Sequence, residues 1–111
     1  MTVEQSGTID IVSIDKDGKV VLTISDHLDW GDSVRHQLLL QAKFNAYLAF
    51  IENGDISKQY PDSEGRQILF RVVSKFKPDV EGMRFFAKAA EVIKSTGFEF
   101  ELKLFAESYD N

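Results

Sequence analysis

Residues 33–53, SVRHQLLLQAKFNAYLAFIEN, decide the fold because their pattern predicts one long helix with two apolar faces. One stripe follows the i, i+3, i+4, i+7 spacing of a helix that packs on a core, and it consists of Leu40, Phe44, Tyr47, Leu48 and Ile51. A second arc holds Leu38, Leu39, Ala42, Ala46, Ala49 and Phe50. A small domain needs only the first stripe, so the second arc predicts contact with more of this chain or with a second molecule.

Residues at the two ends of this segment indicate where the helix begins and where it ends. Asp32 or Ser33 can accept a hydrogen bond from a free backbone N–H and cap the first turn. Gly54, after Asn53, favours the left-handed conformation just past a helix. The predicted helix therefore has about 20 residues and a length of roughly 30 Å.

The segments on either side predict strands and a second helix. Residues 9–14 and 19–25 predict a hairpin around Gly18, with a core face of Ile9, Ile11, Val20, Leu22 and Ile24. Residues 55–65 predict a loop with turns. Residues 66–75 predict a strand that is apolar on nearly both faces. Residues 81–95 predict a helix with Met83, Phe86, Ala89, Ala90 and Ile93 on its buried arc, and residues 98–107 predict an alternating strand.

These segments predict an α+β fold with two layers: a four-stranded sheet and two helices over one of its faces, in the order β-β-α-β-α-β. Residues 1–111 are expected to form a single domain, with about residues 1–7 as a disordered tail. The strand order stays open at this point. If the third and fourth strands are neighbours, Arg71 can meet Glu99 or Glu101 across the sheet.

Composition excludes several classes of function. The net charge of −5 disfavours nucleic-acid binding, and the absence of cysteine excludes disulfides and thiolate chemistry. No segment has the length and apolar character of a signal peptide or membrane anchor, so we expect a cytoplasmic protein. The sequence contains no glycine-rich phosphate-binding motif and no nucleophile elbow, so no catalytic residue, metal or cofactor is assigned.

One polar cluster, residues 26–32 with the sequence DHLDWGD, is a candidate binding site. Asp32 and His36 have the i, i+4 spacing that lets a carboxylate and an imidazole share a cation, with His27 or Asp29 as a third ligand. The alternative is that Asp32 caps the helix, Asp26 and Asp29 shape turns, and both histidines face solvent. Trp30 either anchors the helix start to the core or lines a pocket with His27 and Tyr60. The possible ligand-binding residues are therefore His27, Trp30, Asp32 and His36.

Two stretches, TIDIVSIDKDGKVVLTISDHLDW and LLQAKFNAYLAFIENG with the following QYPDSEG, resemble a small bacterial domain family that is uncharacterised. The resemblance covers nearly the whole chain. It implies a free-standing bacterial protein of unknown function and assigns no site residue.

Three classes of function are compatible with these patterns. The first is a non-catalytic interaction module, most simply a homodimer, with Leu39, Ala42, Ala46 and Phe50 at its interface. We also expect a second exposed apolar area on the far face of the sheet, formed by Val12, Ile14, Val21, Leu69, Val73 and Phe105. The alternatives are an enzyme-like domain with a small-ligand or metal site near residues 26–36, and an acidic inhibitor of a basic partner.

Overall fold

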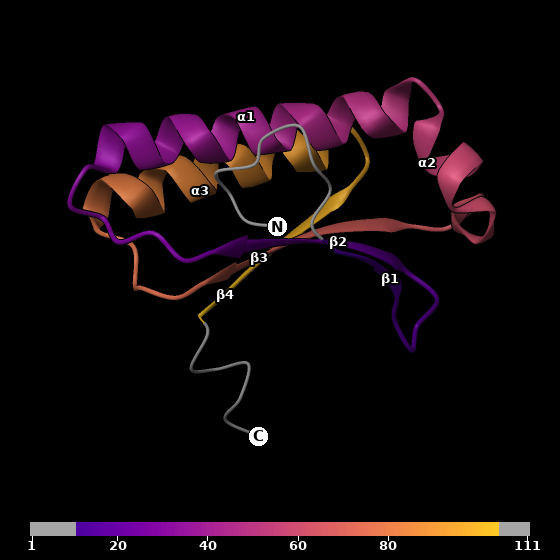
Figure 1. Cartoon of the computed structure of the whole chain (residues 1–111), viewed down its shortest axis with the longest axis horizontal. Helices are drawn as coiled ribbons and strands as arrows, with labels where there is room; N and C mark the ends of the chain where they lie inside the picture. Colours follow the sequence, from indigo (N-terminus) through magenta and orange to yellow (C-terminus); the bar gives the residue numbers. More distant parts are fainter. Residues whose placement is uncertain (1–10, 105–111) are drawn as a thin grey trace.

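The computed structural model describes residues 11–104. The chain forms two strands, then one long helix and two short helical segments, then a strand, a helix and a last strand (Figure 1). In order these are β1 (Ile11–Ile14), β2 (Val20–Asp26), α1 (Ser33–Glu52), α2 (Asp55–Gln59), the 3-10 helix η1 (Pro61–Ser63), β3 (Ile68–Ser74), α3 (Val80–Ser95) and β4 (Glu99–Leu104). The predicted α+β class and element order are confirmed.

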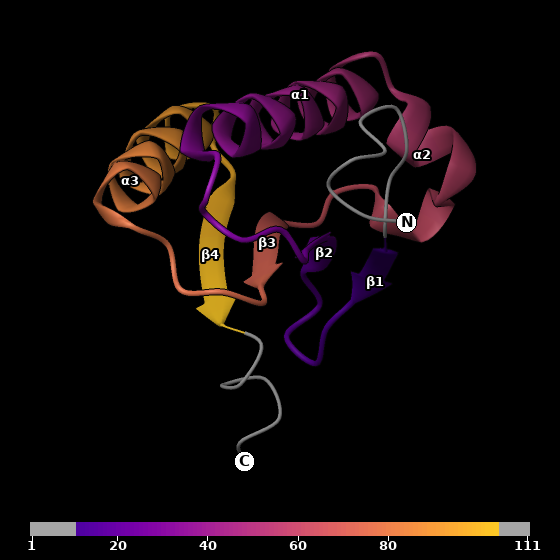
Figure 2. The same cartoon turned by 60° about the vertical axis from the view of Figure 1, so that its left-hand side comes forward.

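The four strands form one sheet in the order β1-β2-β3-β4. β1 and β2 are antiparallel, whereas β2, β3 and β4 are parallel. Both crossovers, through α1 and through α3, step in the same direction along the sheet, so crossovers of the same hand place both helices on the same face. Figures 1 and 2 show α1 and α3 side by side over that face.

The hairpin forms where the sequence predicts it, but its faces are shifted by one residue. Gly18, with φ 82°, ends a turn in which its N–H bonds to the Asp15 carbonyl, and the strands pair Ile14 with Val20 and Val12 with Leu22. Paired residues share a face, so the even-numbered positions of β1 lie on the helix side with Val20 and Leu22. The predicted core position of Ile11, which pairs with Thr23, was therefore wrong, because the odd number of loop residues fixes this register.

The core lies between the helices and the sheet. Leu40, Phe44 and Tyr47 of α1 are at most 5% exposed, and they pack on Val20, Leu22, Ile24, Phe70 and Val72 of the strands and on Phe86 and Ile93 of α3. Asp32 caps α1 by accepting a hydrogen bond from the Arg35 N–H at 3.1 Å, and Gly54 follows the helix with φ 83°. The predicted first stripe and both helix ends are thus confirmed.

Polar pairs and closely packed side chains occupy the far face of the sheet. Arg71 Nε donates to Glu101 Oε2 at 2.7 Å, as predicted, and Lys19 Nζ lies 3.0 Å from Glu99 Oε1. Val21 and Leu69 are buried there. Val73 is half-buried on this face, whereas Val12 and Ile14 lie on the opposite one, so the predicted exposed apolar area does not form among the described residues. Phe105, Ile9 and the predicted tail of residues 1–7 lie outside the described residues.

Residues 55–65 are more ordered than the predicted loop. They form α2 and η1, which pack beside the end of α1, and the ring of Tyr60 meets the ring of Phe50 edge to face at 6.5 Å. In α3, Phe86 and Ile93 are buried as expected, whereas Met83 is 50% exposed. No helix of the described part combines the length and the apolar character that crossing a bilayer requires.

Candidate functional site

The sequence places a carboxylate at the buried end of β2. Val20, Leu22, Ile24 and Asp26 alternate along the strand and face the helices, so the last of them, Asp26, enters the interior at 2% exposure. An ionised carboxylate at such a position requires a partner. His36, at the end of the first turn of α1, supplies this partner and is also 2% exposed.

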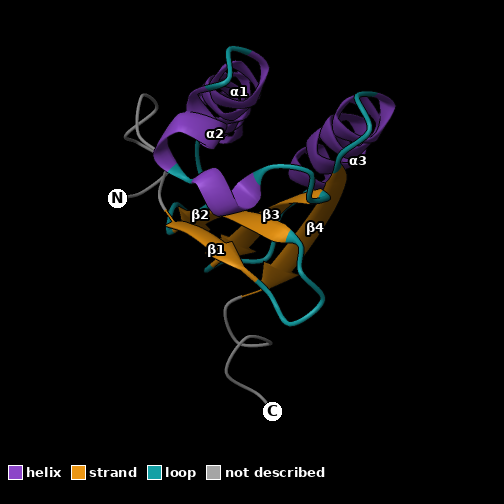
Figure 3. Ribbon diagram, turned by 90° about the vertical axis from the view of Figure 1, so that its right-hand side faces the viewer, coloured by secondary structure: helices purple, strands orange, loops and turns teal. Residues whose placement is uncertain are grey.

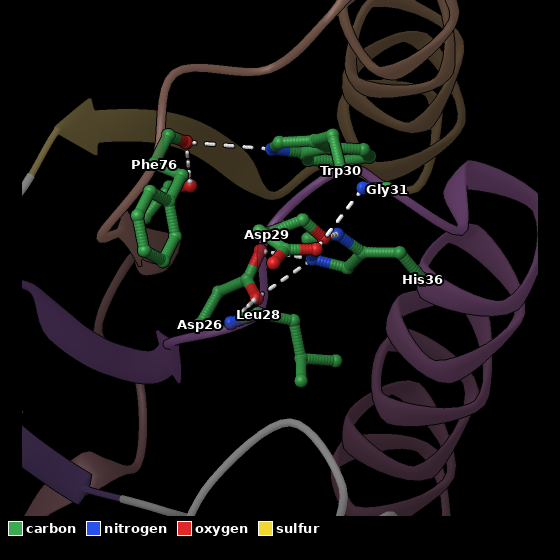
Figure 4. A network of polar contacts seen from close by, with 8 residues as sticks. Asp26, Leu28, Asp29, Trp30, Gly31, His36 and Phe76 are labelled. Atoms are coloured by element: carbon green, nitrogen blue, oxygen red, sulfur yellow. Dashed lines mark hydrogen bonds and ion pairs between the residues drawn. The ribbon is translucent and has the colours of Figure 1, made fainter.

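His36 has both ring nitrogens engaged (Figure 4). Nε2 lies 2.7 Å from Asp26 Oδ1 and 2.6 Å from Asp26 Oδ2, and Nδ1 lies 3.0 Å from the Asp29 carbonyl oxygen. Because a carbonyl oxygen only accepts, Nδ1 carries a proton and donates it. The imidazole and the Asp26 carboxyl then share one further proton along the second contact.

Burial and hydrogen bonding act in opposite directions on the pKa of Asp26. Burial raises the pKa of the Asp26 carboxyl, while the facing His36 and the N–H of Leu28 lower it in part. The His36 imidazole supplies the hydrogen-bond partner that the buried Asp26 carboxyl requires. Neither ring nitrogen keeps a lone pair for a metal ion or for a substrate proton.

The indole ring of Trp30 covers one face of the His36 imidazole. The two rings stack with 3.7 Å between ring centroids, and the indole meets Phe86 of α3 edge to face at 5.9 Å. The indole N–H points to the Phe76 carbonyl at 3.4 Å, in the connection from β3 to α3. α3 admits the indole because residue 82 is glycine: a Cβ there would lie 2.8 Å from the ring. Trp30 therefore anchors the start of α1 to α3, the first of its two predicted roles.

The predicted ligand residues are brought together only in part. A shallow pocket of about 210 Å³ is lined by His27, Asp32, His36 and also by Arg35 and Phe76. Trp30 packs into the α3 contact instead, and Tyr60 lies beside Phe50 near the opposite end of α1.

The prediction that Asp32 and His36 share a cation is wrong. Asp32 caps the helix from an exposed position, while His36 turns inward to Asp26. Among residues 11–104, no group of three or more His, Cys, Asp or Glu side chains is arranged to hold a metal ion.

The predicted interface residues of α1 have different surroundings. Phe50 is 9% exposed and belongs to the core of its own chain, so it is unavailable to a second molecule. The physical reason is the α2 and η1 segment, whose Tyr60 packs on it. Leu39 and Ala46 are half-buried, and Ala42 is exposed. α3 packs on the other side of α1, where Phe44 stacks on Phe85 with 6.2 Å between ring centroids.

The sequence placed Asp26 in the polar cluster as a turn residue, and its Oδ1 does accept from the Leu28 N–H, but its contact with His36 and the role of Gly82 were missed. Asp26 continues the alternation of Val20, Leu22 and Ile24, and this pattern was a sufficient signal that its carboxylate turns inward. The role of Gly82 had no signal in the sequence, because it depends on which side chain approaches α3.

The fold and site define a small α+β domain whose first crossover is fixed by a buried Asp–His pair and a stacked indole. A family model described as a family of unknown function, DUF6572, matches residues 1–106. The chain belongs to this family. Comparisons with curated proteins and with solved structures gave no match.

Proposed function

We propose that this protein is a small non-catalytic module that self-associates through the exposed side of α1. The exposed residues of this helix, called the α1 face below, are Val34, Arg35, Leu38, Gln41, Ala42, Asn45, Ala49 and Glu52. Only Arg35 and Glu52, near its two ends, are charged, and Lys43 between them is buried. Leu38 is 60% exposed. Charged residues make up 28% of the chain, and their depletion is typical of the centre of an interface, so this charge-free centre carries the proposal.

A second copy of the chain is the occupant that the charges of this face favour. A two-fold axis through the middle of the α1 face pairs the helices antiparallel, so that each residue faces one equally distant from the helix midpoint. Arg35 then lies opposite Glu52 of the second copy, Leu38 opposite Ala49, and Ala42 opposite Asn45. Opposite charges meet at both ends, and a large apolar side chain meets a small one between them.

The neighbouring groove extends the apolar area. A groove of about 270 Å³ runs between α1 and α3, with Leu48, Phe85 and Val92 among its lining residues. A contact made by one helix face and part of a groove belongs to the small class of interfaces, below about 1,200 Å² in total. We therefore expect a dissociation constant in the micromolar range, about −8 kcal/mol.

Sedimentation velocity of the full chain from about 1 µM to 500 µM tests the proposal directly. We expect a concentration-dependent shift from monomer to dimer. Leu38→Glu replaces the exposed leucine of the α1 face by a carboxylate that faces Ala49 of the second copy, and it should keep the chain monomeric. The matched control is Val80→Glu, since Val80 is a similarly exposed residue at 67% on another helix. A wild-type chain that stays monomeric at 500 µM, or equal effects of the two variants, contradicts the proposal.

The remaining sequence-based expectations have less support. An acidic inhibitor rests on the net charge of −5 alone, and a ligand site near residues 26–36 rests on a shallow pocket beside an already satisfied histidine. A cytoplasmic location and a bacterial origin remain predictions.

A further inference from the structure

β4 is an end strand of the sheet, so its outer edge has no strand beside it among residues 11–104. Figure 3 shows β4 at the side of the sheet away from β1, with α3 above it. The Lys75 N–H donates to the Asp26 carbonyl, so the odd-numbered residues of β3 bond to β2 and the even-numbered ones to β4. The odd-numbered residues of β4 then bond back to β3. Phe100 and Leu102 therefore direct their backbone N–H and C=O groups outward, where an edge strand can pair with another chain.

The side chains of this edge complement a second copy of themselves. Glu101 and Lys103 lie on the open face of the sheet, whereas Phe100 and Leu102 are half-buried on the helix side. A two-fold axis perpendicular to the sheet at Leu102 pairs two β4 strands antiparallel, so that Phe100 lies opposite Leu104 of the second copy. Glu101 of each copy then lies opposite Lys103 of the other.

The same charges disfavour the neighbouring registers. A shift of the axis by one residue toward either end of β4 places Glu101 opposite itself or Lys103 opposite itself. Like charges directly opposite each other across two strands are destabilising, and opposite charges are stabilising. An antiparallel pair centred on Leu102 is therefore the register that the charges favour.

α3 adds an apolar contact at the same axis. It runs antiparallel to β4, and the ring of Phe86 lies 6.2 Å from the ring of Phe100. Met83, one turn earlier on α3, therefore lies near the level of Leu102. It is on the side of α3 away from α1, since Phe85 lines the groove between the two helices, and it is 50% exposed. The axis at Leu102 thus brings the two Met83 side chains toward each other.

We propose that the outer edge of β4 pairs antiparallel with β4 of a second copy, centred on Leu102, and joins the two sheets into one. This contact shares no residue with the α1 face, so it goes beyond the proposed dimer and does not depend on it. Used together, the two contacts link dimers into longer chains of copies. The edge contact is the weaker one, populated only above about 500 µM, because a strand of six residues offers few hydrogen bonds.

Charge-exchange variants test this register in the Leu38→Glu chain, in which the α1 contact is removed. Lys103→Glu leaves only carboxylates at the paired positions and Glu101→Lys leaves only ammonium groups, so neither variant should pair with itself. A mixture of the two places opposite charges across both positions, and it should associate at least about fivefold more tightly than either variant alone. The measurement is the methyl NMR signal of Met83 up to about 2 mM, which should shift in the mixture only.

Lys58→Glu and Glu64→Lys provide the matched control, because these exposed residues lie beside the opposite edge of the sheet and change the net charge by the same amounts. Their mixture should associate no more tightly than the two variants do separately. The Leu38→Glu chain with its natural β4 adds a measurement without any charge variant, since its Met83 signal should move with concentration in the same direction. Equal association of the edge mixture and its separate variants, or a Met83 signal that stays fixed at all concentrations, overturns the proposal. A wild-type chain that lacks the α1 contact leaves these expectations unchanged.

Discussion

Replacing Gly82 by alanine tests how tightly Trp30 joins the two helices. A glycine in an exposed helix interior is about 1 kcal/mol less favourable than alanine, so helix propensity alone predicts a more stable protein. The structure predicts the opposite. The new Cβ would lie 2.8 Å and 2.9 Å from two carbons of the Trp30 ring and 3.0 Å from the Pro78 Cβ. Trp30 cannot retreat freely, since it stacks on His36 at 3.7 Å and touches Phe86.

Overpacking of this kind typically costs about 1–3 kcal/mol, which outweighs a propensity gain that is reduced in the first turn of a helix. We therefore expect Gly82→Ala to lower the free energy of unfolding by about 1–2 kcal/mol. For a domain of this size, each kcal/mol corresponds to a fall of about 4–8 °C in Tm. Urea denaturation followed by circular dichroism measures the first quantity, and a thermal melt the second.

The matched background is Trp30→Phe, whose smaller ring leaves room for the new methyl group. In that background Gly82→Ala should be neutral or stabilising, which gives a coupling energy of at least about 1 kcal/mol in the double-mutant cycle. A Gly82→Ala variant as stable as wild type, or an equal loss in both backgrounds, would refute the packing of Trp30 against α3.

Three further predictions concern the charged pairs. His36→Ala removes the partner of a buried carboxyl and should destabilise the protein by about 3–5 kcal/mol, measured by urea denaturation. Arg71→Ala breaks a partly exposed pair with Glu101 and should lower stability by no more than about 1 kcal/mol in the same assay. The raised pKa of Asp26 means that the folded chain binds this proton more tightly than the unfolded chain does. The stability from this group is complete below the unfolded pKa of about 3.9 and is lost as pH rises through the folded pKa. Unfolding free energies measured against Asp26→Asn should therefore fall for wild type as pH rises, by at most about 1.4 kcal/mol per pH unit, and a rising difference would contradict the assignment.

Local signals in the sequence predicted the elements and their order well. The apolar stripe of α1, the capping by Asp32 and the glycine after the helix are properties of neighbouring residues, and the structure confirms each of them. The pairing of Arg71 with Glu101 also followed, since β3 and β4 are adjacent and parallel.

Relations between distant segments were harder to predict. The faces of β1 depend on the number of residues in the hairpin loop, and the burial of Phe50 depends on a segment that the sequence presented as a loop. The exposed side of α1 is therefore centred on Leu38 and Asn45 rather than on Ala46 and Phe50. In the site, the i, i+4 spacing of Asp32 and His36 predicted that these two act together, whereas the partner of His36 is Asp26, ten residues before it.

Disulfide cross-linking measures the antiparallel contact of the α1 face most directly, because the chain contains no cysteine. In the proposed dimer, position 38 of each copy faces position 49 of the other. The double variant Leu38→Cys/Ala49→Cys should therefore form a covalent dimer on mild oxidation. Within one chain these positions are about 16 Å apart along the helix, too far for a disulfide.

The two single variants provide the matched controls, since equivalent positions of the two copies are separated by a similar distance along the helices. The account predicts a high yield of covalent dimer from the double variant at 100 µM, little from either single variant, and loss of the product at dilution below 1 µM. No cross-linked dimer from the double variant, or equal yields from all three variants, would contradict self-association through this face.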